Sequence, residues 1–384
     1  MRYILFATDY DGTLASQGVV DESTLKAMDE LKRSGRKAVL VTGRELEDLN
    51  KLFPQIDMFD LVVAENGGLI YKPRTKEVCP LTEVPSEIFL ARLRKRGIPF
   101  SVGHGIVATW EPHQTAVLEV IKELGLELQL SFNKGAVMVL PSGVNKKTGL
   151  ETALKKLGLS AHNVVGIGDA ENDHVFLSAC ECGVAVANAL PTLKERADIV
   201  MQNGYGAGVR ELIRHLLKDD LRSCDQQLRR HQMLLGRQDG DQPVNITPYR
   251  GNLLFAGPSG SGKSSAATGV LERLAEQQYQ FCLIDPEGDY GNFMGALQFG
   301  TPHAAPEVSQ VLKALDDPKQ NIVINLLGVP LPDRPLFFGS LLPQLLDLRT
   351  RTARPHWIIV DEAHHMLPSS WVLEAVSCHN RSPG

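Results

Sequence analysis

The sequence predicts an α/β protein with two parallel-sheet domains, the first of which is interrupted by a small α+β insertion. Short apolar runs rich in β-forming residues alternate with segments of helical periodicity in both halves of the chain. Several of these runs end in acidic, glycine or threonine residues, as strands do where they open into functional loops. At 384 residues the chain is long enough for two or three domains with cores of their own.

The composition is that of an ordinary soluble globular protein, with 43% hydrophobic and 22% charged residues. A net charge of -5 and a pI near 6.1 argue against a dominant nucleic-acid or anionic-membrane surface, although a local basic patch remains compatible with them. We expect no membrane association and a reduced, cytoplasmic location, because no apolar run reaches membrane-spanning length and no leader precedes the first strand. The cysteines lack metal-site or disulfide spacing; they are Cys79, Cys180, Cys182, Cys224, Cys282 and Cys378.

The first predicted strand, residues 3–8, opens into Asp9-Tyr10-Asp11-Gly12-Thr13-Leu14. In an extended segment residues two apart point the same way, so Asp9 and Asp11 can converge on one cation or one phosphorus atom. Like charges this close perturb each other's proton affinity, which favours a chemical role. An Asx-type turn after a strand is the alternative.

A helix is predicted at residues 21–34 and a second strand at 37–41, which ends in Thr42-Gly43-Arg44. This pattern again places a hydroxyl at the carboxyl end of a strand, before a helix whose N-terminus favours an anion. It predicts a phosphate site between Thr42 and the Asp9 loop. The alternative is that Thr42 simply caps the following helix.

A third strand at residues 61–64 is closed by Glu65-Asn66-Gly67-Gly68, and the parallel pattern then stops. Residues 72–144 read as an α+β insertion that covers the loops of the first domain like a lid. Its helices are predicted at residues 88–96 and 114–124. Its strands are predicted at residues 100–110, 126–132 and 136–140.

The parallel pattern resumes where Lys146 begins a helix and a strand at residues 164–168 leads into Asp169-Ala170-Glu171-Asn172-Asp173. Residues four apart in a first helical turn share a face, so Asp169 and Asp173 can face one site. The last helix is predicted at residues 209–217. A polar stretch of mixed charge follows and reads as a solvated linker.

The sequence so far contains four signals at strand ends or helix starts: Asp9 with Asp11, Thr42, Lys146, and Asp169 with Asp173. Together they supply what phosphoryl transfer to a carboxylate requires. One aspartate attacks, a second handles the proton of the leaving group, and a hydroxyl and a lysine neutralise the phosphoryl oxygens. The remaining acids offer the oxygen ligands that Mg²⁺ prefers. A chance assembly of all four signals in this order is a far weaker explanation.

On these motifs, residues 1–215 resemble the haloacid dehalogenase (HAD) superfamily and, through the segments at 65–68 and 183–189, its Cof-like sugar-phosphatase (IIB) branch. The resemblance implies a Rossmann-like core at residues 1–71 and 145–217 with a cap at 72–144. It also implies that Asp9 is the nucleophile, which forms an aspartyl-phosphate, and that Asp11 is the general acid/base.

The same resemblance implies that Thr42, Gly43 and Lys146 bind the phosphoryl group, with Lys146 favoured over its neighbour Lys147 by the motif alignment. Mg²⁺ would rest on Asp9, the backbone carbonyl of Asp11, and Asp169, with Asp173 supporting the metal shell. The cap would select the substrate, a phosphorylated small acid or a sugar phosphate. Its candidate substrate contacts, each also readable as an ordinary cap residue, are His104, Trp110, His113 and Lys134.

A second phosphate site is predicted after a linker at residues 218–243. A strand at 253–256 leads into Gly257-Pro258-Ser259-Gly260-Ser261-Gly262-Lys263-Ser264, with a helix at 265–277 behind it. In this pattern backbone amides wrap the phosphates of ATP, the lysine reaches the β/γ oxygens and the serine coordinates Mg²⁺. The expected nucleotide-binding residues are Gly257, Gly260, Gly262, Lys263, Ser264 and Ser265, and the expected Mg²⁺ ligand among them is Ser264.

A later strand, residues 357–360, ends in Asp361 and Glu362. Asp361 would hold the Mg²⁺ shell and Glu362 would orient the attacking water. Together with the strand at 281–284, these pieces resemble the HerA/FtsK-type ATPases, which pump DNA as ring-shaped oligomers. The resemblance implies a RecA-like P-loop domain at residues 244–384, which we expect to be partial, and oligomerisation through it.

The sequence therefore predicts a Mg²⁺-dependent phosphatase for a small phosphorylated metabolite. The attached P-loop domain is expected to bind ATP, and the sequence leaves open whether it also hydrolyses ATP. The alternative is an ATP-driven nucleic-acid translocase subunit with an accessory phosphatase domain. A catalytically idle scaffold that responds to nucleotide has less support, because every catalytic position is filled.

Overall fold

The chain divides into two compact units, Met1–His231 and Gln232–Gly384, each described here by itself. The computed structural model describes residues 1–228, 230–249, 251–258 and 260–367. Ser259 of the glycine-rich loop and Cys378 lie outside the described residues. None of the helices in the described ranges is both long and apolar enough to cross a membrane.

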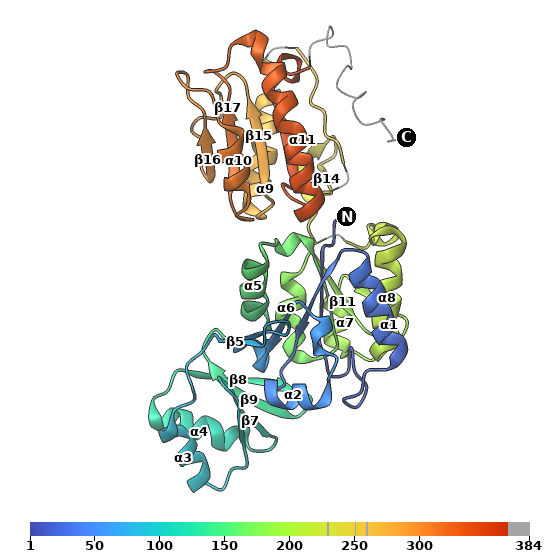
Figure 1. The fold of residues 1–384 in the computed structure, drawn as a ribbon, viewed down its shortest axis with the longest axis vertical. Helices are drawn as coiled ribbons and strands as arrows, with labels where there is room; N and C mark the ends of the chain where they lie inside the picture. Colours follow the sequence, from blue (N-terminus) through green and yellow to red (C-terminus); the bar gives the residue numbers. More distant parts are fainter. Residues whose placement is uncertain (229, 250, 259, 368–384) are drawn as a thin grey trace. The chain divides into compact units, whose positions relative to one another are not determined.

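Unit 1 is built on an eight-stranded sheet in the order β12-β11-β10-β1-β2-β3-β4-β5 (Figure 1). All pairings from β12 to β3 are parallel, so the carboxyl ends of these strands meet at one edge. The strands are β1 Leu5–Thr8, β2 Lys37–Val41, β3 Leu61–Ala64, β4 Leu69–Lys72, β5 Glu77–Pro80, β10 Val164–Gly168, β11 Cys182–Ala185 and β12 Ile199–Val200. Since β1 lies at the centre with every residue buried, its sequence is an unbroken apolar run rather than an alternating one.

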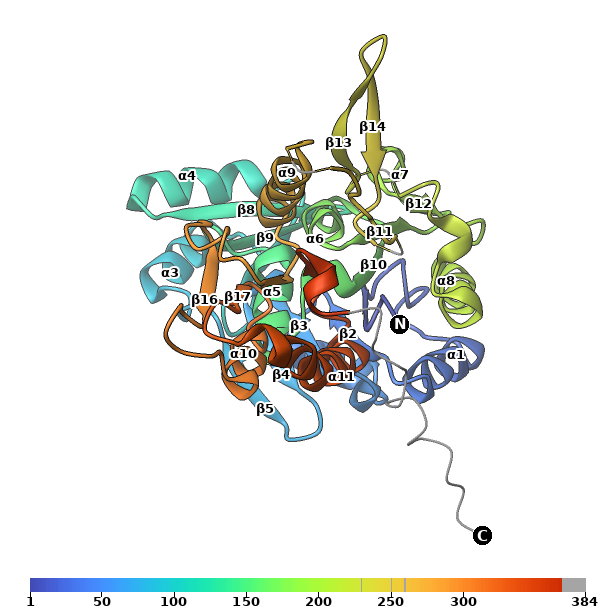
Figure 2. The ribbon, with the colours of Figure 1, turned by 90° about the horizontal axis from the view of Figure 1, so that it is seen from above.

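Helices cover this sheet, and a side chain caps the N-terminus of the first of them. Asp21 caps the first helix by accepting a hydrogen bond from the Thr24 backbone amide at 2.9 Å. Figures 1 and 2 show α1 and α8 side by side, which agrees with their packing contacts. The helices of the core are α1 Glu22–Arg33, α2 Leu46–Leu52, α5 Lys146–Leu157, α6 His174–Ala179, α7 Pro191–Arg196 and α8 Tyr205–Asp219.

The insertion is an α+β cap, as predicted, with an antiparallel sheet in the order β6-β7-β9-β8. Helices pack on the sheet around a shared core that includes Phe89, Leu93, Val117 and Val139. The single strand predicted at residues 100–110 is in fact two strands joined by a turn. The elements are α3 Glu87–Lys95, β6 Ser101–Val102, β7 Val107–Trp110, α4 Gln114–Leu124, β8 Leu128–Asn133 and β9 Ala136–Pro141.

The start of the cap differs from the expected residue 72. Residues Glu77–Pro80 form β5, which pairs antiparallel with β4 and so extends the core sheet. A tight turn in which Lys76 has a φ of 55° brings the two strands together. Residues 77–80 therefore belong structurally to the core sheet, and the first secondary-structure element of the cap is α3.

Unit 2 contains a four-stranded parallel sheet in the order β16-β17-β15-β18 with helices on both faces. Alternate residues of β15 show the two faces: Cys282 and Ile284 pack with α10 and α11, whereas Phe281 and Leu283 pack with α9. The elements are α9 Lys263–Glu276, β15 Phe281–Asp285, β16 Ala296–Phe299, α10 Val308–Leu315, β17 Asn321–Asn325, α11 Arg334–Thr352 and β18 Trp357–Val360.

Two expectations for this half of the chain were wrong. Residues 253–256 form no strand in the described structure, and the Leu254 side chain is 85% exposed. The second half of the expected linker is a hairpin of β13 Met233–Gln238 and β14 Gln242–Ile246, which projects from its unit in Figure 2. Asp239-Gly240 at its tip is a common hairpin turn signal that the sequence analysis overlooked.

Candidate active site

The predicted phosphatase residues converge at the carboxyl edge of the core sheet. Asp9 follows β1, Thr42 follows β2 and Asp169 follows β10, three neighbouring parallel strands. Asp173 belongs to the short turn after Asp169, and Lys146 is the first residue of α5. All five side chains are buried. The four charged ones form one compact cluster inside the protein.

Lys146 is at the centre of this cluster. Its Nζ donates to Oδ1 of Asp9 at 2.5 Å and to Oδ1 of Asp173 at 2.6 Å. Lys147, which the sequence left as the alternative, is instead about half exposed, with its Nζ 3.9 Å from Glu151. Consecutive helical residues point about 100° apart, so only one of the two lysines can face the acids.

The acids and the lysine strongly perturb one another. Burial, the Asp173 carboxylate and the Asp169 carboxylate raise the pKa of Asp9, and the Lys146 ammonium opposes this shift. Burial alone would lower the pKa of Lys146, but Asp173 and Asp9 outweigh it and raise that pKa. Burial also raises the pKa of Asp169. Lys146 therefore offsets only part of the cost of placing these carboxylates together in a buried cluster.

The donor set fits a hard divalent cation. One carboxylate oxygen from each of Asp9, Asp169 and Asp173 lies within 4.8 Å of the other two. Asp173 is the most engaged of the three, because its Oδ2 also accepts the backbone amides of Asp169 at 2.8 Å and Ala170 at 2.9 Å. Asp9 and Asp169 would therefore hold a metal directly, with Asp173 fixing the loop that carries Asp169.

Gly12 allows this close approach of the two loops. Its φ is 82°, and a Cβ added there would lie 2.2 Å from Oδ2 of Asp169. Thr13, the next residue, donates from its hydroxyl to Oδ1 of Asp169 at 2.9 Å. The Gly-Thr pair after Asp11 therefore positions the carboxylate of the neighbouring strand.

Asp11 pairs with an arginine. Arg44 donates through Nε to Oδ2 of Asp11 at 2.6 Å and through Nη2 to Oδ1 at 2.7 Å. This two-pronged hydrogen bond is the main cause of the raised pKa of Arg44, with the Asp48 carboxylate adding to it. The sequence analysis included Arg44 in a motif without giving it a role, because nothing local links it to a residue 33 positions earlier.

Thr42 is buried, and its hydroxyl accepts the Arg44 backbone amide at 3.1 Å. It is not a helix cap, since α2 begins only at Leu46 after Glu45. A Cβ on Gly43 would lie 3.1 Å from the sulfur of Met138 in the cap strand β9. The Thr42-Gly43 loop therefore lies beneath the cap.

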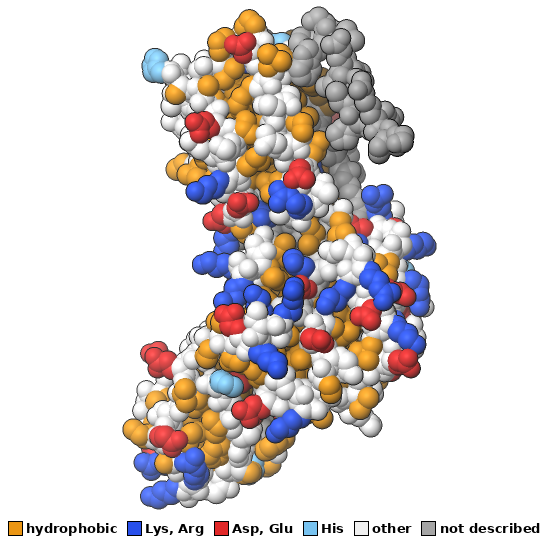
Figure 3. Space-filling view, viewed as in Figure 1, with side chains coloured by type: hydrophobic (Ala, Val, Ile, Leu, Met, Phe, Trp, Pro, Cys, Tyr) orange, Lys and Arg blue, Asp and Glu red, His pale blue; other side chains and the backbone are white. Residues whose placement is uncertain are grey.

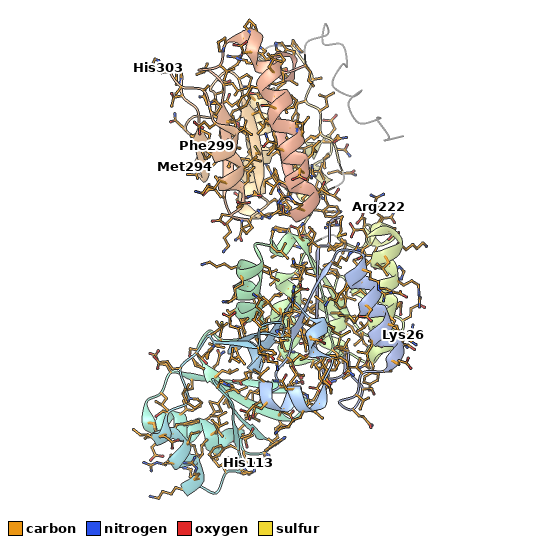
Figure 4. All side chains as sticks on the ribbon, viewed as in Figure 1. Lys26, His113, Arg222, Met294, Phe299 and His303 are labelled. Carbon is orange, nitrogen blue, oxygen red and sulfur yellow. The ribbon has the colours of Figure 1, made fainter. Side chains whose placement is uncertain are left out.

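The cap adds residues to the site, and one of the four cap candidates contacts a catalytic acid. Lys134, in the turn between β8 and β9, donates from Nζ to Oδ2 of Asp169. His104 instead donates its backbone amide to Glu65 at 3.1 Å. Trp110 is half exposed at the end of β7, and His113 precedes α4 on the cap (Figure 4).

Core residues after β3 support the cap and were missed by sequence reasoning. The buried Glu65 carboxylate accepts the Gly105 amide at 2.8 Å in addition to that of His104. Asn66 bonds Ser131 of the cap at 3.1 Å and accepts from Asn172 at 3.0 Å. The motif Glu65-Asn66-Gly67-Gly68 was noted as a strand end and as part of the family resemblance, but no contact with the cap was predicted from it.

In unit 2 the glycine-rich loop precedes α9 as the sequence predicts. Lys263 Nζ donates to the carbonyl oxygens of Gly257 and Pro258, both at 3.0 Å. Gly260 and Gly262 have φ values of 76° and 87°, which only glycine adopts readily. Ser264 and Ser265 occupy the exposed first turn of α9.

A cavity of about 610 Å³ adjoins this loop. The lining residues of this cavity include Lys263, Tyr290, Asp361 and Glu362. The two acids predicted to hold Mg²⁺ and to orient water therefore share one space with the loop lysine. Burial raises the pKa of Asp361, with Glu362 adding to the shift. A carboxylate with a perturbed pKa that lines a cavity is a candidate functional residue.

The fold and the acid–lysine cluster define a phosphoryl-transfer hydrolase with an inserted cap. The chain matches the family model of haloacid dehalogenase-like hydrolases over residues 6–104 and 112–213, and it belongs to that family. It is a phosphoric monoester hydrolase of the HAD type. Residues 246–383 match a model of an AAA domain, which confirms the P-loop ATPase-type domain, whereas the narrower HerA/FtsK resemblance stays a prediction.

Named relatives point the same way. The chain is 31% identical over 220 residues to phosphoglycolate phosphatase 2 of Saccharolobus solfataricus, covering 56% of this chain and 92% of the relative. It is 31% identical over 221 residues to phosphoglycolate phosphatase of Methanothermobacter thermautotrophicus, covering 55% and 97%. A crystal structure of a Thermoplasma acidophilum protein is similar with a TM-score of 0.50 at 18% identity, over 56% of this chain and 99% of that one, which shows the fold alone.

Proposed function

We propose that unit 1 hydrolyses a small phosphorylated acid, of which 2-phosphoglycolate is the simplest candidate, with Mg²⁺ as its cofactor. The observation that carries this proposal is the contact of Lys146 with both Asp9 and Asp173 beside Asp169, at the edge where parallel strands end. Relatives of the chain are named phosphoglycolate phosphatases.

In the proposed reaction an oxygen of the Asp9 carboxylate attacks phosphorus and the ester oxygen leaves with a proton from Asp11. Lys146 and Thr42 offset the charge on the phosphoryl oxygens. Water then attacks the aspartyl-phosphate, Asp11 takes its proton, and phosphate leaves while Asp9 is restored. Mg²⁺, bound by Asp9 and Asp169, would supply further charge neutralisation.

The pair between Asp11 and Arg44 sets a condition on this cycle. Both oxygens of Asp11 accept hydrogen bonds from Arg44, so neither is directed at a leaving group. Asp11 therefore has to leave this pair, at least in part, before it can carry a proton to the leaving group. Because its side chain is about one third exposed, it can turn without disturbing the core.

Lys134 supports an acidic substrate. It is a cap residue whose ammonium lies at the catalytic acids, and the carboxylates of Asp169 and Asp9 help to raise its pKa against the effect of burial. A charged lysine on the cap side of the site would pair with a carboxylate next to the phosphate ester. A neutral sugar offers it no such partner.

This assignment predicts that Lys134→Met raises the KM for 2-phosphoglycolate by about tenfold or more, the effect of losing one charge-assisted contact. The kcat/KM for glucose 6-phosphate should change by less than about threefold, because the sugar does not need the lysine. Phosphate release with Mg²⁺ over a range of substrate concentrations measures both.

The exposed cap residue Lys122, changed to Met, is the matched control and should behave as the wild type with both substrates. Equal losses with the acid and the sugar would contradict the carboxylate role of Lys134. Absence of metal-dependent phosphate release from every small phosphomonoester tested would reject the proposed function itself.

For unit 2 we propose ATP binding at the cavity beside the glycine-rich loop. Gly257, Gly260, Gly262, Lys263, Ser264 and Ser265 would hold the phosphates, with Ser264 and Asp361 at Mg²⁺ and Glu362 at the attacking water if hydrolysis occurs. Lys263 donates hydrogen bonds to two loop carbonyls, which carry no net charge. The phosphate groups of ATP are anionic and would replace these carbonyls as its partners. The face shown in Figure 3 mixes basic and acidic side chains on unit 1, so it gives no separate support to the nucleic-acid alternative.

Lys263→Ala should weaken binding of a fluorescent ATP analogue by about tenfold or more, since one charged hydrogen-bond donor is worth about 1.5–3 kcal/mol. Lys313→Ala, on the exposed face of α10, is the control and should bind as the wild type does. Unchanged binding of the ATP analogue by Lys263→Ala would show that the nucleotide does not bind at this loop. The translocase alternative additionally requires ring assembly and DNA-stimulated ATP hydrolysis, and a monomer indifferent to DNA excludes it.

A further inference from the structure

Unit 1 contains a second cluster of metal-ligating side chains at the opposite edge of its sheet. His162 lies two residues before β10 and Glu181 lies directly before β11, so both are at the amino ends of their strands. His231 joins them from the segment after α8. The active-site acids follow the carboxyl ends of β1 and β10, so the two clusters are separate.

The three ligand atoms are close together. Nδ1 of His162 is 2.6 Å and Nε2 of His231 is 3.6 Å from the same oxygen, Oε2 of Glu181. All three atoms lie within 4.8 Å of one another. A tetrahedral zinc ion with bonds near 2.0–2.1 Å places its ligand atoms about 3.3 Å apart, a value that the two measured distances bracket.

The protonation forms of Glu181 and His231 are also suited to binding a metal. Burial alone would raise the pKa of Glu181, but the hydrogen bond from His162 and the charge of the Arg2 guanidinium help to hold that pKa at about 2. Burial lowers the pKa of His231 to about 4, so its imidazole is neutral near pH 7. An ionised carboxylate and a neutral imidazole are the forms that bind a metal.

The other oxygen of Glu181 has its own partner. Arg2 donates from Nη2 to Oε1 of Glu181, which leaves Oε2 directed at the two imidazoles. The guanidinium also lies 3.5 Å from Asp225, which offsets part of its charge. Outer partners of this kind orient the ligating carboxylate in metal sites.

We propose that Oε2 of Glu181, Nδ1 of His162 and Nε2 of His231 bind a transition-metal ion of the Zn²⁺ class, with a water as fourth ligand. Two imidazoles and one carboxylate form a common zinc set, whereas Mg²⁺ prefers oxygen ligands alone. The bound metal fastens the segment that ends unit 1 to the amino edge of the core sheet. This role is independent of the phosphatase reaction.

Calorimetric titration of the full chain with ZnCl₂, at saturating Mg²⁺ so that the acidic cluster is occupied, tests the proposal. The wild type should bind one more zinc equivalent than His162→Ala and His231→Ala, or bind it at least about tenfold more tightly. His303→Ala, on an exposed loop of unit 2 (Figure 4), should keep the wild-type stoichiometry and affinity. Titration with Co²⁺ should give the visible absorption of a tetrahedral N/O site in the wild type and in His303→Ala, but not in His162→Ala or His231→Ala.

Circular dichroism of each variant distinguishes loss of the fold from loss of metal binding. His231→Gln repeats the test with a side chain of similar size. Wild-type zinc binding in both histidine variants would overturn the proposal. The absence of zinc binding by the wild type would overturn it equally, and would leave the cluster as a set of ion pairs and hydrogen bonds.

Discussion

Asp9→Asn is expected to reduce phosphate release by about 10⁴-fold or more, the scale seen when a covalent nucleophile is removed. The amide has the shape of the carboxylate but cannot form the acyl-phosphate bond. In chelator the variant should at the same time melt a few degrees above the wild type, at about 2–4 °C per kcal/mol for a unit of this size. The reason is that burial disfavours the charge of Asp9, and Asp173 and Asp169 repel it. The uncharged amide removes both costs, which together outweigh the lost pairing with Lys146.

Steady-state phosphate release and thermal melting of the same preparation measure both effects. Asp29→Asn, the same change on the exposed face of α1, is the control and should alter neither. An Asp9→Asn protein that retained more than about 1% of wild-type turnover would contradict a nucleophilic Asp9. A lower melting temperature would contradict the view that the cluster is overcharged without metal.

Lys146→Met is expected to lower phosphate release by about 10²–10³-fold and to destabilise unit 1 by about 3–5 kcal/mol. Methionine fills a similar volume but leaves Asp9 and Asp173 buried without their cation. Denaturant unfolding of unit 1 and phosphate release measure the two losses.

Lys147→Met provides the control one residue away, and should stay within about 0.5 kcal/mol of the wild type. Should Lys146→Met fold poorly, its response to Mg²⁺ still decides the case: the melting temperature should rise more with Mg²⁺ than that of the wild type does, because more uncompensated negative charge remains. An equal response of both proteins would mean that Lys146 does not balance the metal-binding acids.

The positions of these residues were predictable because each belongs to a local pattern. Asp9, Thr42 and Asp169 directly follow apolar runs that could only be buried strands, and parallel strands bring their carboxyl ends together. Lys146 follows Asn145, whose side chain caps α5 by accepting the backbone amides of Lys147 and Thr148. The start of the helix, and with it the direction of the lysine, was thus set by neighbouring residues.

What the sequence did not reveal depends on contacts between distant segments. The pair of Asp11 with Arg44 and the bond of Lys134 to Asp169 each join residues more than 30 positions apart. The zinc-class cluster joins three segments, none of which has metal-site spacing. The strand expected at 253–256 shows the converse: this run is apolar and β-forming, but in the described chain it joins no sheet.

The bond pattern of Glu65 bears on how fast substrate and product can pass the cap. Its buried carboxylate holds two consecutive backbone amides of the cap, those of His104 and Gly105. An excursion of the cap that separates this segment from the core breaks both bonds together, at roughly 1.5–3 kcal/mol for each charged hydrogen bond. Exchange through that movement therefore belongs to the microsecond-to-millisecond range of domain motions and not to the nanosecond range of surface loops. The turnover rate of a fast substrate would then report the opening of the cap and not the breaking of the ester bond.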